Sequence, residues 1–131
     1  MLHGGRLGNV REDVAKFTSS RKDDARLADA VLAINKAHVV MLMKQKIINW
    51  QDGAKILAAL QIQDSQKLDP KAEDVHMAVE EAVLAETGPE VGGNLHIAKS
   101  RNDQVTTAIR MALRKELINI CLLYTSDAAD E

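Results

Sequence analysis

Aliphatic side chains recur at steps of three and four residues through most of the chain, and this spacing constrains the fold more than any other feature. One such stretch runs from Asp23 to about Lys46. Others cover about 49–63, about 73–86 and the residues from Ser100 onwards. The period is that of an α-helix with one buried face. Because the chain has a single Phe, Trp and Tyr, its core must be aliphatic, which favours helices over sheets. We therefore expect an all-α fold.

Capping and breaking residues separate these stretches. Asn49, with Asp52 three residues later, has the pattern of a helix N-cap. Gly88-Pro89 is expected to end the third helix. The segment 89–99, which contains Gly92-Gly93, is expected to be a connector without a helix of its own. The pattern thus predicts four helices, the last of which begins near Ser100.

The same pattern divides the chain into four parts. Residues 1–22 are expected to form a loose N-terminal arm, residues 23–98 a helical domain, and residues 99–120 the start of a long helix. Residues 121–131 depart from the apolar pattern of that helix. Their sequence resembles the conceptual translation of a widely used transposase sequencing adaptor. We therefore expect that they are not natural protein sequence and that the reading frame was interrupted within the helix.

Composition excludes several classes of function. A formal net charge of −2 without a basic stripe gives no case for a nucleic-acid partner. No apolar run approaches the roughly 20 residues that span a bilayer, and the start lacks the apolar region of a signal peptide. A single cysteine, Cys121, excludes an internal disulfide framework. The four histidines lack the spacing of a zinc site. We expect a cytoplasmic protein with no metal and no contact with nucleic acid or membrane.

The segment Ser100-Arg101-Asn102-Asp103-Gln104 has the chemistry of an anion-binding site. It lies where the connector becomes a helix, and a helix N-terminus presents unpaired N–H groups and the positive end of the helix dipole. Arg101 adds a planar guanidinium that suits a carboxylate, and Asn102 adds an amide donor. Gly92-Gly93 would let the backbone approach a ligand closely. Spacing alone favours the simpler alternative, in which Ser100 is an ordinary N-cap and Arg101 points into solvent.

An ordered set of motifs across residues 4–120 resembles the argininosuccinate lyase family. The motifs occur in the order and at the spacing typical of that family. They are Gly5-Arg6-Leu7, Phe17-Thr18-Ser19-Ser20 with Asp24, Ala37-His38 with Met41-Leu42, Glu73-Asp74-Val75-His76-Met77 with Glu80, Val91-Gly92-Gly93 with His96, and Ser100-Arg101-Asn102-Asp103-Gln104-Val105 with Arg110. The sister lyases that act on adenylosuccinate, fumarate and aspartate share the fold but match this set less well.

The resemblance implies both a fold and a reaction. The chain would supply the N-terminal helical domain of the fumarase/aspartase-type lyase fold, within 23–98, and the start of the central helical bundle, within 99–120. The reaction would be the elimination of argininosuccinate to arginine and fumarate in arginine biosynthesis, without a cofactor, in a cytoplasmic homotetramer. Because the family's catalytic histidine and serine belong to later regions, beyond residue 120, the chain alone is expected to be inactive.

The resemblance also implies which residues contact the substrate. Asn102 is expected to be the strongest contact, with Ser100 and Arg101 beside it. In the N-terminal region Ser20 and Asp24 match contact positions, and Asp24 is suited to the cationic guanidinium side. His96 and His76 match family positions, but both a direct role and a packing role stay open for each. His38, on the apolar face of the first helix, is expected in the core.

Two positions depart from the family pattern, which usually has Gly and Arg where this chain has Ala98 and Lys99. Ala98 would restrict the connector if the backbone there needs positive φ, and Lys99 keeps the charge without the guanidinium fork. Alternative functions also stay open. The protein could be a catalytically silent structural homologue, as some lens crystallins are, or a related lyase such as adenylosuccinate lyase, or a stand-alone helical binding module.

Overall fold

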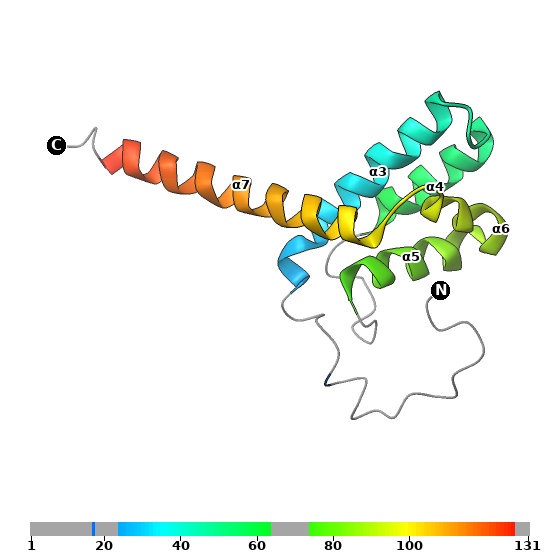
Figure 1. The fold of residues 1–131 in the computed structure, drawn as a ribbon, viewed down its shortest axis with the longest axis horizontal. Coiled ribbons are helices and arrows are strands. Elements are labelled where there is room, and N and C mark those ends of the chain that lie inside the picture. The colour runs from blue at the N-terminus through cyan, green and yellow to red at the C-terminus, as the bar shows by residue number, and fades with distance from the viewer. Residues whose placement is uncertain (1–16, 18–23, 64–73, 128–131) are drawn as a thin grey trace.

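The computed structural model describes residues 17, 24–63 and 74–127, and Figure 1 shows the arrangement of their helices. These helices pack around an aliphatic core. No strand is present in this part of the chain, which confirms the all-α prediction. The helices are η1 (Ala25–Leu27), α3 (Ala28–Lys44), α4 (Trp50–Ile62), α5 (Val75–Thr87), α6 (Pro89–Gly92), η2 (Gly93–His96) and α7 (Arg101–Asp127). The contact predicted at Ser20, the motif Gly5-Arg6-Leu7 and nearly all of the arm 1–22 lie outside the described residues.

Side-chain caps fix the starts of two helices. The Asn49 side chain accepts a hydrogen bond of 2.8 Å from the backbone N–H of Asp52, which confirms the predicted cap of α4. At α5 the N-cap is Asp74, whose Oδ1 accepts from the Met77 N–H at 2.7 Å. Each cap satisfies one of the N–H groups that a helix start leaves unpaired. The cap at Asp74 also fixes a carboxylate beside the candidate site.

The core lies among α3, α4 and α5, which contact one another pairwise. Its fully buried side chains are aliphatic, as the scarcity of aromatic residues predicts. They include Val31, Val39, Leu42, Ile56, Leu60, Val75, Val79 and Val83. Leu95 and Ala108 join the core from η2 and α7. The fold therefore holds the segment around η2 and the start of α7 against the same core as the three main helices.

The connector 89–99 is largely helical, which corrects the prediction of a segment without helices. Gly88, with φ +80, ends α5, and Pro89 begins the short helix α6. Gly92 then packs directly on α5, since an added Cβ would lie 2.7 Å from Thr87 Oγ1 and 3.1 Å from Leu84 Cα. Only glycine allows this approach without displacing α5. The contact places η2, the next turn of chain, alongside α5.

Helix α7 is the longest element, and most of it extends away from the other helices (Figure 1). Its start contacts α3 and η1, and Gln104 and Ala108 are buried there. Beyond this contact, its apolar side chains Ile109, Leu113 and Leu117 are about half exposed, with fractions of 50, 57 and 52%. The helix continues to Asp127, so the change of sequence near residue 120 does not coincide with its end. None of the described helices is long and apolar enough to cross a membrane.

Candidate anion-binding site

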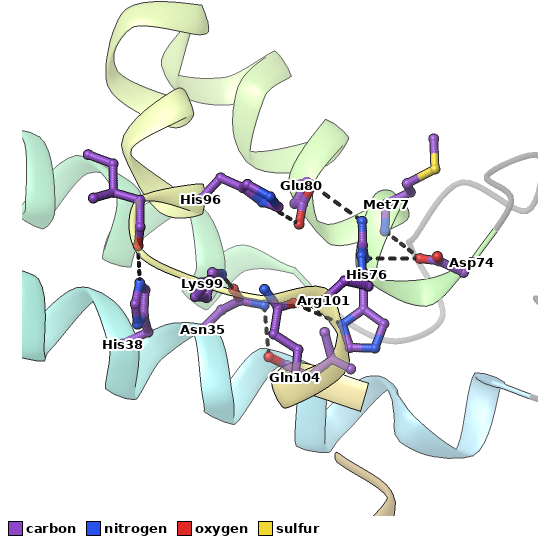
Figure 2. A network of polar contacts seen from close by, with 12 residues as sticks. Asn35, His38, Asp74, His76, Met77, Glu80, His96, Lys99, Arg101 and Gln104 are labelled. Atoms are coloured by element: carbon purple, nitrogen blue, oxygen red, sulfur yellow. Dashed lines mark hydrogen bonds and ion pairs between the residues drawn. The ribbon is translucent and has the colours of Figure 1, made fainter. Parts of the chain in front are cut away.

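The guanidinium of Arg101, the first residue of α7, lies between two carboxylates of the α5 region. Its Nη1 is 3.3 Å from Asp74 Oδ1, and its Nη2 is 3.7 Å from Glu80 Oε2 (Figure 2). The Arg101 side chain keeps 25% of its surface exposed. Arg101 is therefore held in place rather than solvated, which argues against the simpler alternative for this residue. Part of its surface still faces outward.

Glu80 makes a second contact, with His96 at the end of η2. Glu80 Oε1 lies 3.1 Å from His96 Nδ1, so one carboxylate contacts His96 through one oxygen and Arg101 through the other (Figure 2). An ionised carboxylate can only accept, so His96 donates through Nδ1. Half of the His96 side chain is exposed, against 15% of Glu80. The structure thus joins two of the residues predicted as substrate contacts, His96 and Arg101.

A buried pair, His76 and Gln104, lies behind this contact. His76 Nδ1 is 3.1 Å from Gln104 Oε1, and each residue is only 3% exposed. Burial, together with the positive charge of Arg101, lowers the pKa of His76, although Asp74 and Asp24 act in the opposite direction. His76 is therefore neutral at neutral pH and fastens α5 to the first turn of α7. Its position favours the packing role over direct contact with a ligand.

Lys99 reaches back to α3 from the connector. Its Nζ donates a hydrogen bond to Oδ1 of Asn35, a buried residue whose amide also donates to the Val31 carbonyl at 2.9 Å. Burial lowers the pKa of Lys99 from 10.5 to about 8. The charge of Glu80 opposes this shift, and that of Arg101 adds to it. Lys99 is thus a partly buried cation at the site that loses its charge just above neutral pH.

One backbone conformation and one side-chain contact shape the same connector. Ala98 adopts φ +57, so the family's usual glycine would fit this position without the strain that a Cβ brings. His38 Nε2 lies 2.8 Å from the Ile97 carbonyl oxygen. His38 is half-buried and hydrogen-bonded across to the connector, which corrects its expected place in the core. Burial lowers its pKa, so the neutral ring donates to Ile97.

The remaining predicted contacts lie at the edges of this cluster. Ser100 directly precedes α7, and Asn102 is its second residue. Both are exposed, with no side-chain hydrogen bond to another residue within 24–63 and 74–127. Asp24 lies just before η1, and its carboxylate is near enough to His76 to act on the protonation of that ring. The structure thus places Ser100, Arg101 and Asn102 together at the start of α7 and joins His96 to Arg101 through Glu80, while Ser20 lies outside the described residues. Whether these residues bind a substrate stays a prediction.

Sequence reasoning assigned no role to three residues that the structure places in the site. Asp74 and Glu80 belong to a motif that was matched as a whole, and their contacts with Arg101 were not foreseen. The sequence could have indicated a role for Asn35, because a buried amide on the apolar face of a helix needs a hydrogen-bond partner. Its partner Lys99 lies 64 residues away, and nothing local indicates it.

The arrangement is suited to binding an anion next to α7. Lys99 and Arg101 supply two cations, and the first turn of α7 supplies N–H groups and the positive end of its dipole. Exposed Ser100 and Asn102 add outward-facing donors. The two carboxylates of Asp74 and Glu80 equal the formal charge of these two cations, so the site favours directed hydrogen bonds over general attraction. Among the described residues, no group of His, Cys, Asp and Glu side chains could hold a metal ion.

Comparison with known proteins gives consistent matches. A family model described as lyase matches residues 8–126. The chain is 40% identical over 126 residues to an argininosuccinate lyase of Methanococcus maripaludis, covering 92% of this chain and 26% of the relative. It is 43% identical over 124 residues to that of Methanosphaera stadtmanae, covering 90% and 26%. A third, from Methanocaldococcus jannaschii, is 39% identical over 126 residues, covering 92% and 26%. The chain thus spans about a quarter of the length of these relatives.

Proposed function

This chain belongs to the lyase family, and we propose that it forms the N-terminal part of an argininosuccinate lyase. Similarity to argininosuccinate lyases over about nine-tenths of the chain supports this proposal. The ordered motifs from Gly5 to Arg110 belong to this similarity and make it specific to that family. The reaction of the whole protein is the elimination of argininosuccinate to arginine and fumarate, a step of arginine biosynthesis.

The observation that carries the proposal is the cluster at the start of α7. Elimination begins when a base removes a proton next to a carboxylate, and negative charge then grows on that side of the substrate. Donors fixed in advance at that position stabilise the growing charge. The first N–H groups of α7, with Ser100, Arg101 and Asn102, are such donors, and the Asp74 and Glu80 carboxylates hold Arg101 in place. Asp24 contacts the cationic guanidinium side of the substrate.

The catalytic base and acid come from parts of the protein beyond this chain, so residues 1–131 alone are inactive. The whole protein is a homotetramer of the cytoplasm. The exposed apolar side chains of α7, among them Leu113 and Leu117, support the assembly, because helices of other subunits would cover them. The reaction needs neither a metal nor an organic cofactor.

The test uses the complete protein that contains this chain. It is supplied with argininosuccinate and, separately, with adenylosuccinate, and fumarate is followed by its ultraviolet absorbance. We expect fumarate from argininosuccinate alone, and none from residues 1–131 assayed in the same way. Fumarate from adenylosuccinate instead would indicate that the protein is an adenylosuccinate lyase. No fumarate from either substrate would favour a silent structural homologue.

A further inference from the structure

One carboxylate, that of Glu80, contacts two side chains of the site that belong to different elements. Glu80 Oε1 is 3.1 Å from His96 Nδ1 on η2, and Glu80 Oε2 is 3.7 Å from Arg101 Nη2 on α7 (Figure 2). The Glu80 side chain is only 15% exposed, so it is fixed more firmly than the half-exposed His96 ring that it holds. Neither contact adds to the aliphatic core. Glu80 therefore acts on the site rather than on the packing beneath it.

The position of Glu80 follows from the way α5 packs. Val75, Val79 and Val83 are fully buried and fix the rotation of the helix. This orientation turns His76 and Glu80, four residues apart and thus on one face, towards the start of α7. His76 contacts Gln104 there, and Glu80 contacts Arg101. Because Gly92 packs closely on Leu84 and Thr87 of the same helix, η2 lies within reach of the second Glu80 oxygen.

We propose that Glu80 is the positioning residue of this site: its carboxylate fixes the His96 ring and the Arg101 guanidinium relative to each other, and so sets the direction in which both meet a bound substrate. Because Glu80 accepts from His96 Nδ1, the other nitrogen of the neutral ring, Nε2, is an acceptor. Two contacts from separate elements thus act as one preorganised unit. The effect on substrate binding rests on the proposed function, whereas the effect on the two side chains does not.

The first experiment tests the positioning itself, on the 131-residue chain, by NMR of the His96 ring nitrogens and of the Arg101 Nη–H groups, the guanidinium hydrogens that face Glu80 and Asp74. In the unchanged chain we expect the neutral His96 ring to carry its proton on Nδ1. Glu80→Leu removes the acceptor, so both tautomers are populated and the Arg101 Nη2–H groups exchange faster with water. Glu80→Gln keeps an oxygen for His96 but removes the charge, so the tautomer stays and only the Arg101 exchange rises.

The control is Glu81→Leu, the same change at the neighbouring exposed position, which should leave both signals unchanged. Backbone amide spectra report whether each variant keeps the fold, and Glu80→Gln serves if Glu80→Leu does not fold. The proposal would be overturned if removal of the Glu80 carboxylate changed neither the His96 tautomer nor the Arg101 exchange rate.

The second experiment measures the consequence in the complete protein. We expect Glu80→Gln to lower kcat per folded protein about tenfold, because a misplaced Arg101 guanidinium no longer stabilises the charge that grows in the transition state. Glu81→Gln should match the unchanged protein. An unchanged kcat per folded protein in Glu80→Gln would show a merely structural role. If the unchanged protein yields no fumarate, the proposed function fails. The NMR experiment still tests whether Glu80 positions His96 and Arg101, because it does not depend on the reaction.

Discussion

Lys99→Arg replaces an amine that titrates just above neutral pH with a guanidinium that stays charged. Burial lowers the pKa of Lys99 to about 8, against 10.5 for the ordinary amine. Between these values the unfolded chain holds a proton that the folded chain has released, so this residue makes the fold more stable as pH rises. From about pH 7 to about pH 9 the full effect is about 1.3 kcal/mol. Since Lys99 is only partly buried, solvent screening reduces it to about 0.7 kcal/mol.

The assay is urea unfolding followed by far-ultraviolet circular dichroism, for both proteins at both pH values. Arginine can still donate to Asn35, and every other titrating group is common to the two proteins and cancels in the comparison. We expect the free energy of unfolding of the unchanged chain to gain about 0.7 kcal/mol more than that of Lys99→Arg on going to the higher pH. An equal gain in both would refute the reasoning, because the Lys99 amine would then titrate alike in the folded and unfolded chain.

Three further substitutions test the packing around the site, each by urea unfolding. Gly92→Ala should lower the free energy of unfolding by about 1–3 kcal/mol, because the added Cβ would lie 2.7 Å from Thr87 Oγ1. Its control, Gly93→Ala, should leave that free energy unchanged, since no atom lies within 4 Å of the added Cβ. Equal effects of the two substitutions would contradict the close approach of Gly92 to α5. Ala98→Gly should raise the free energy of unfolding by about 1 kcal/mol, because glycine adopts φ +57 without the strain that the alanine Cβ causes. A loss of stability would show that Ala98 is not strained. Burial lowers the pKa of His76, so below about pH 6.5 the unfolded chain binds a proton at this residue before the folded chain does, and stability falls. His76→Gln should therefore lose less stability than the unchanged chain on acidification below that pH. An equal loss in both proteins would show that other residues cause it.

Local chemistry made most of the fold predictable. The side chain of Asn49 caps α4 through Asp52, and α7 begins one residue after Ser100. Glycine and proline at 88–89 end α5 as expected. In each case the determining residues lie within a few positions of the feature. The strain foreseen at Ala98 also follows from a single residue, because the backbone there does adopt positive φ.

The internal contacts of the site were not predictable, because they join residues that are far apart in the chain. Lys99 and Asn35 are 64 residues apart, His38 and Ile97 are 59, and Arg101 and Asp74 are 27. The short helices α6 and η2 were missed because close packing of Gly92 on α5, a tertiary contact, places them. The segment that we propose to bind the anion could be named from the sequence, but not the carboxylates that hold its arginine.

The claim that the start of α7 binds the substrate carboxylates is tested most directly by Asn102→Ala in the complete protein. Asn102 is exposed and makes no side-chain hydrogen bond with the described residues, so its loss should leave the fold and the oligomer unchanged. The matched control is Thr106→Ala, at an exposed position one turn further along α7. The measurement is kcat/KM for fumarate formation from argininosuccinate, with the oligomer checked by light scattering. We predict that Asn102→Ala lowers kcat/KM by about a hundredfold while Thr106→Ala does not. A normal kcat/KM for Asn102→Ala would contradict the claim and remove Asn102 from the site.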